Sequence, residues 1–88
     1  MKLKKNYVMT RLGEESILVP VGTATADFRG VIRLNETAAF IVEQIKNGAS
    51  AEQIADAITR EYEIDRDAAL RNVESVIAKL MEIHAIEA

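Results

Sequence analysis

The sequence contains no cysteine and no tryptophan, and only one histidine and one proline among its 88 residues. Without cysteine, the chain can form no disulfide, no thiolate nucleophile and no cysteine-ligated zinc site. Its single histidine, His84, has no set of acidic residues near it at a spacing typical of metal ligands. The four glycines are isolated turn residues and form no phosphate-binding loop. We therefore expect no enzyme activity, no cofactor and no metal.

Long apolar runs are also absent. No stretch approaches the roughly 18 residues of a membrane span, and Lys2, Lys4 and Lys5 lead into a polar segment, which is unlike a signal peptide. These features predict a cytoplasmic protein with no membrane partner. The net charge of −3 opposes general binding of nucleic acid, which requires a basic face to release counterions.

Hydrophobic residues make up 49% of the sequence, although aromatic residues make up only 5%. This content is typical of a folded domain, and it predicts an aliphatic core. A chain of this length buries roughly 60–65% of its unfolded surface, which is enough for one modest core. We expect residues 1–88 to form a single domain.

Alternating apolar residues in the first part of the chain predict a β-sheet. A short loop at Gly13 joins the first two candidate strands as a hairpin. Pro20 lacks a backbone donor, so pairing should stop or bulge there. Small and polar residues at 22–29 predict a loop before the third strand. The candidate strands are residues 7–12, 16–21 and 30–34.

Helical spacing of apolar residues predicts three helices after Asn35. Asn35 is a good N-cap, and Ser50 with Gln53 forms a capping box. The predicted fold is α+β and similar to a winged helix-turn-helix, with an N-terminal three-stranded antiparallel sheet followed by the helices. The candidate helices are residues 36–46, a second from Ser50, and a third from Asp65 to about Ile83.

The third strand runs almost without a loop into the first helix, which should hold its edge at the surface. Such an edge can accept another chain as an additional strand. The third helix has a wider apolar stripe than one buried face requires. We assign Val76 and Leu80 to the core, and Val73 and Ile77 to contact with a bound peptide or partner.

The sequence resembles the PqqD family, also known as RiPP recognition elements, over nearly its whole length. The most specific part is the segment from Gly30 through Val31-Ile32-Arg33-Leu34-Asn35-Glu36-Thr37-Ala38-Ala39. Two positions depart from the family pattern. His84 lies near a position that is usually glycine, and Val42 replaces a common aromatic residue whose space Phe40 is expected to fill. Apolar residues also match the pattern at Ile41, Ile54, Ala55, Tyr62, Ile64, Leu80 and Ile86.

The resemblance implies that the domain binds the leader segment of a ribosomally made precursor peptide. The leader would add as a strand to the third strand, with apolar side chains in a groove beside the third helix. The domain would then present the peptide to a modifying enzyme, often a radical-SAM protein. The candidate peptide-binding residues are Arg29, Gly30, Val31, Ile32, Arg33, Leu34, Leu70, Val73 and Ile77.

Two other functions stay open at this point. A winged helix-turn-helix fold can bind DNA through its recognition helix. The third helix, however, mixes Arg66, Arg71 and Lys79 with several acidic residues and has no basic excess. The chain could also be a structural partner of an enzyme that binds no peptide. A homodimer is a further expectation, because an open strand edge can be covered by a second copy, with residues 22–29 as a hinge.

Overall fold

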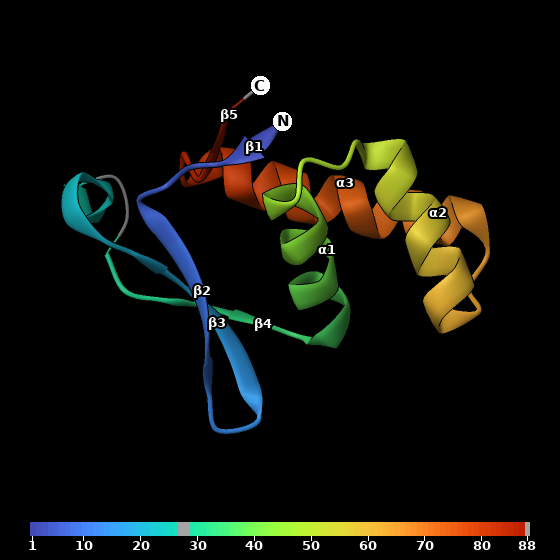
Figure 1. Ribbon diagram of the computed structural model, residues 1–88, viewed down its shortest axis with the longest axis horizontal. Helices are drawn as coiled ribbons and strands as arrows, with labels where there is room; N and C mark the ends of the chain where they lie inside the picture. The colour runs from blue at the N-terminus through green and yellow to red at the C-terminus, as the bar shows by residue number, and fades with distance from the viewer. Residues whose placement is uncertain (27–28, 88) are drawn as a thin grey trace.

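The computed structural model describes residues 1–26 and 29–87. A sheet of three strands lies at one end of the molecule and α2 at the other, with α1 between them, while α3 runs behind α1 from α2 toward the sheet end (Figure 1). The predicted α+β fold, an antiparallel sheet followed by three helices, is therefore confirmed. The elements are β1 (Lys2–Leu3), β2 (Tyr7–Leu12), β3 (Glu15–Pro20), η1 (Gly22–Ala26), β4 (Ile32–Leu34), α1 (Glu36–Lys46), α2 (Ala51–Tyr62), α3 (Arg66–Glu82) and β5 (Ile86–Glu87).

The main sheet has the order β2-β3-β4, and all neighbouring strands are antiparallel. Side chains alternate between its two faces, so Leu18 and Leu34 lie in the core while Val8 and Leu12 are exposed. β3 ends at Pro20, as its missing donor predicts. The predicted loop at 22–29 contains the short helix η1, and residues 27 and 28 of that loop lie outside the described residues.

The third predicted strand is shorter than expected. β4 begins at Ile32 and not at residue 30, although it ends at Leu34 as predicted. Gly30 has a φ of +102°, which no extended strand adopts and which favours glycine. The chain therefore turns at Gly30 and pairs with β3 only over residues 32–34.

The helices begin at the predicted caps. The Asn35 side chain accepts a hydrogen bond from the Ala38 N–H at 2.8 Å, and Ser50 and Gln53 form both hydrogen bonds of the capping box. Asp65 caps α3 in the same way. These local bonds satisfy N–H groups that would otherwise lack partners, so the caps fix where each helix starts.

Two positions at which the sequence departs from the family pattern have a structural explanation. His84 adopts a φ of +60°, the left-handed conformation that explains why glycine is usual near this position. Phe40 does not fill space at Val42, because residues two apart on a helix point in nearly opposite directions. Phe40 instead packs edge-on against Tyr62, with the ring centroids 5.7 Å apart, while Val42 is fully buried.

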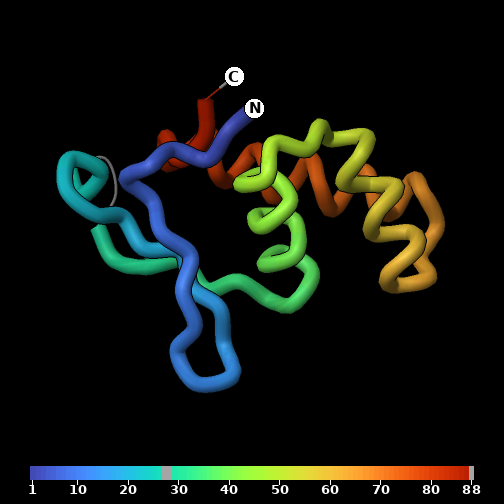
Figure 2. Tube along the Cα trace, in the orientation of Figure 1, coloured from blue at the N-terminus to red at the C-terminus, as the bar shows by residue number. Residues whose placement is uncertain are grey.

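A second, two-stranded sheet joins the ends of the chain. β1 and β5 pair antiparallel, and the Lys4 N–H donates to the Ala85 carbonyl at 2.8 Å. The buried Tyr7 hydroxyl donates to the Ile83 carbonyl at 2.6 Å. Both ends of the described chain therefore lie side by side above the core, as Figure 2 shows.

The Tyr7 hydroxyl ties the start of the main sheet to the end of α3, so its removal should lower stability. We expect Tyr7→Phe to reduce the free energy of unfolding by about 1.5 kcal/mol, because the Ile83 carbonyl then loses its buried donor. Tyr62→Phe is the matched control and should change stability by less than about 0.5 kcal/mol. Chemical denaturation measures both, and equal losses in the two variants would contradict this assignment.

Candidate peptide-binding edge and groove

The outer edge of β4 is the first part of the candidate site. β4 pairs with β3 on one side only, and no other strand pairs with its second side among residues 1–26 and 29–87. Leu34 is buried and Ile32 is half-buried against the core, whereas Arg33 is exposed. This alternation anchors the strand through its apolar side chains and leaves main-chain groups at the free edge for a further strand.

The junction between β4 and α1 holds this edge in place. Only Asn35 separates the last strand residue from the first helical residue, and the side chain of Asn35 is committed to the cap. Figure 2 shows the chain passing directly from the strand into the helix. The edge is thus fixed to the helical core, as the sequence predicts.

A hollow of about 220 Å³ lies between the start of α1 and α3. Val76 is its α3 apolar residue, and Ile41 and Ala38 contribute from α1. Val76 is half-buried, so part of its side chain is available to an apolar group entering from outside. The residues lining the hollow are Asn35, Thr37, Ala38, Ile41, Asn72, Ser75 and Val76.

The predicted roles on α3 need correction. Val73 is fully buried, so it belongs to the core and offers no surface to a peptide. Val76, which the sequence assigned to the core, packs against the core but is only half-buried and also lines the hollow. Leu70 and Ile77 are half-buried against the core but do not line this hollow. They are seven residues apart and share one side of α3, about 100° around the axis from Val76.

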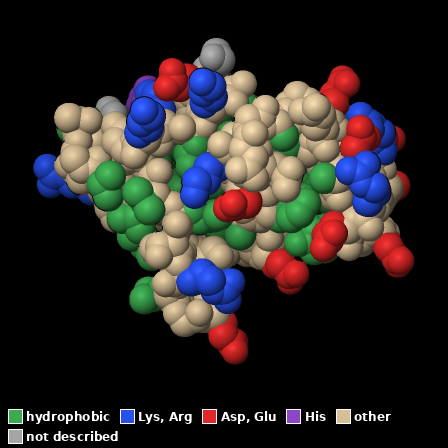
Figure 3. Space-filling view, viewed as in Figure 1, with side chains coloured by type: hydrophobic (Ala, Val, Ile, Leu, Met, Phe, Trp, Pro, Cys, Tyr) green, Lys and Arg blue, Asp and Glu red, His purple; other side chains and the backbone are tan. Residues whose placement is uncertain are grey.

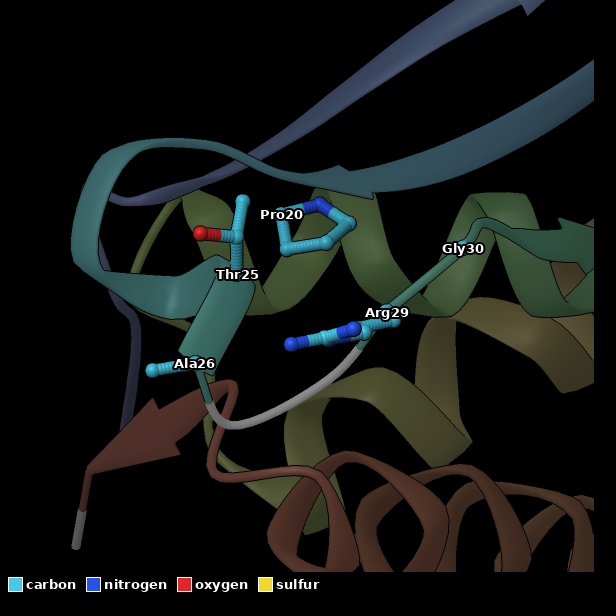
Figure 4. A pocket seen from close by; sticks show the side chains of 5 residues that line it. All are labelled: Pro20, Thr25, Ala26, Arg29 and Gly30. Carbon is cyan, nitrogen blue, oxygen red and sulfur yellow. The ribbon is translucent and has the colours of Figure 1, made fainter.

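A second hollow, of about 550 Å³, lies at the start of β4. In Figure 4 the Arg29 side chain extends into the space between η1 and the segment near Gly30, with Pro20 on the far side. Arg29 forms no ion pair with another described residue. Arg33, by contrast, approaches Glu15 at 3.7 Å. Of the predicted residues, Ile32 to Leu34 form β4, while Arg29 and Gly30 line the hollow at its start.

Charged side chains outside the candidate site are predicted from the sequence to form a solvated surface. No group of three or more histidine, cysteine or acidic side chains is close enough to hold a metal within the described ranges. Arg66 on α3 is paired with Asp56 on α2, so it is not directed outward as a free cation. On the face drawn in Figure 3, acidic side chains lie mainly over the helical end, while hydrophobic side chains are exposed over the sheet.

Tyr62 is the described group with a shifted pKa. Partial burial raises the pKa of its phenol, and the carboxylates of Glu36 and Glu61 raise it further. The phenol therefore stays neutral at ordinary pH. Its role is to pack against Phe40 at the contact between α1 and α2.

Among the described residues, no helix is long and apolar enough to cross a membrane.

An exposed strand edge beside a hollow of mixed lining, in which Val76 and Ala38 lie among asparagine, serine and threonine side chains, is typical of a peptide-binding class of domain. The family model described as "Coenzyme PQQ synthesis protein D (PqqD)" matches residues 15–86, so the chain belongs to the PqqD family. The resemblance found in the sequence is thereby confirmed. No protein of curated function matches the chain.

Two solved structures are similar to this one. The first is TbiB1 in complex with the TbiA(beta) leader peptide, with a TM-score of 0.82 and 24% identity, covering 100% of this chain and 96% of that one. The second is lasso peptide synthetase B1 complexed with the leader peptide, with a TM-score of 0.76 and 26% identity. It covers 92% of this chain and 89% of that one. The fold of this chain is thus one that both leader-bound proteins share.

Proposed function

We propose that this domain binds the leader segment of a ribosomally synthesised precursor peptide through the free edge of β4. The observation that carries the proposal is the open edge of β4 beside the hollow at Val76. Membership of the PqqD family supports it, as do two similar structures that were determined with leader peptides. The domain then presents the bound peptide to a modifying enzyme, for which a radical-SAM protein is our candidate.

In strand addition, main-chain hydrogen bonds and side-chain contacts would have different roles in binding the leader. Hydrogen bonds from the β4 edge would set the register of the leader and supply part of the affinity. Every second leader side chain would point toward the helices, where the hollow at Val76 can take an apolar group. Ile32, half-buried on the same border, would form the sheet side of this groove.

The domain acts as an adaptor in this proposal and carries no catalytic group of its own. Among the described residues that line the two hollows, Arg29 is the single ionisable one, so no set of described titratable side chains converges there. Catalysis therefore belongs to the partner enzyme. A homodimer through the β4 edge would compete with the leader for the same main-chain groups, so we expect leader binding to favour the monomer.

Calorimetry tests the proposal with overlapping synthetic peptides, called tiles, that cover any short precursor sequence found encoded beside the gene of this chain. We expect one leader tile to bind, and its affinity to fall less than about tenfold between low and high salt. A protein that neutralises about six DNA phosphates would lose roughly a thousandfold. A scrambled tile is the control and should not bind.

Each alternative function has its own outcome in this experiment. Binding of duplex DNA that collapses with added salt would favour a DNA-binding regulator. Binding of the modifying enzyme without binding of any tile would favour a purely structural partner. Either result would overturn the leader proposal.

A further inference from the structure

The hollow at the start of β4 is adjacent to the proposed groove but has a different chemistry. The residues that line it are Pro20, Thr25, Ala26, Arg29 and Gly30. Arg29 supplies the only charge among its described lining residues, and its side chain extends into the hollow (Figure 4). The Thr25 hydroxyl already donates to the Gly22 carbonyl at 2.8 Å. The guanidinium group of Arg29 is therefore the strongest donor available here.

A bound leader would pass this hollow, if the leader binds as proposed above. Every pairing in the sheet is antiparallel, and an added strand that continues this pattern runs from Leu34 toward Ile32. The next leader residues on its C-terminal side then pass Gly30. At Gly30 the positive φ turns the chain, and no heavy atom lies within 4 Å of the place where a Cβ would be. The space beside Gly30, next to Arg29 in sequence, is thus open.

We propose that Arg29 is a specificity-determining residue that binds a carboxylate, from Asp or Glu, in the leader segment just C-terminal to the paired strand. The chain as a whole has a net charge of −3, so an acidic peptide gains no general attraction to it. An arginine at the end of the edge that forms no ion pair with another described residue provides local attraction and also sets the register. Arg33 cannot take this role as readily, because Glu15 already lies 3.7 Å from it.

A double-mutant cycle tests this assignment with the leader tile that binds wild-type protein. Arg29→Gln should weaken binding about fivefold, as should replacement of the leader Asp or Glu by its amide. The two changes together should weaken binding no more than either one alone. Arg29→Glu should recover affinity when the peptide carries lysine at that position. Arg71→Gln, an exposed change on α3, is the matched control and should have no effect.

The outcomes separate this inference from the function on which it rests. If no leader tile binds wild-type protein, the proposed function fails. If a tile binds but Arg29→Gln leaves its affinity unchanged, or the two changes weaken binding additively, the role of Arg29 is overturned. A bound leader with no acidic residue in that segment would overturn it as well.

Discussion

Val76→Asp is expected to weaken leader binding at least thirtyfold, which corresponds to about 2 kcal/mol. Val76 lines the hollow between α1 and α3, where an apolar leader side chain would be received. A carboxylate at this position would be desolvated beneath that side chain, and this desolvation opposes binding. Calorimetry with the leader tile measures the effect, after circular dichroism has shown that the variant is folded.

Ile77→Asp is the matched control for this experiment. Ile77 is adjacent in sequence and is also half-buried, but it lies on another side of α3 and does not line the hollow. The same change there should reduce leader affinity less than about threefold, with a comparable cost in stability. The opposite result is a strong loss of leader affinity in Ile77→Asp and little loss in Val76→Asp. It would show that the leader contacts the side of α3 that carries Ile77, as the sequence first indicated.

Val31→Pro is expected to weaken leader binding about tenfold while the domain stays folded. Val31 precedes β4, is 50% exposed and lies outside the pairing of β4 with β3. Proline removes its N–H, and with it one main-chain donor to the added strand. The loss of about one hydrogen bond, together with a restricted φ, corresponds to about 1.4 kcal/mol.

Val31→Ala separates the main-chain effect from the loss of the side chain. It keeps the N–H and should bind the leader within about twofold of wild type. Thermal unfolding checks the sheet in both variants. If Val31→Pro unfolds the domain, its N–H contributes to the fold. If the variant is stable and binds normally, the leader does not use this end of the edge.

Local chemistry explains why the sequence predicted most of the fold. Asn35, Ser50 and Asp65 each accept a hydrogen bond from the first turn of the helix that follows, so their identities alone locate the helix starts. The hairpin turn is equally local, because Gly13 adopts a positive φ. The open edge of β4 followed from its short connection to α1.

Tertiary packing explains what the sequence could not provide. The apolar stripe of α3 extends around more than half of the helix circumference. The sequence pattern therefore does not indicate which part of the stripe faces the sheet. α3 contacts both α1 and α2, which buries Val73 and leaves Val76 at the hollow. The β1 and β5 strands have two residues each, and only contact between distant ends of the chain makes them strands.

The pairing of β1 with β5 has a practical consequence for handling the protein. It brings the two ends of the described chain together, away from β4 (Figure 1). A fluorescent reporter or a flexible tether attached at either end would leave from the same corner and would not cover the binding edge. Energy transfer between a donor dye at one end and an acceptor dye at the other would fall when β1 separates from β5. The dyes would lie away from β4, so this measurement would not require a bound peptide.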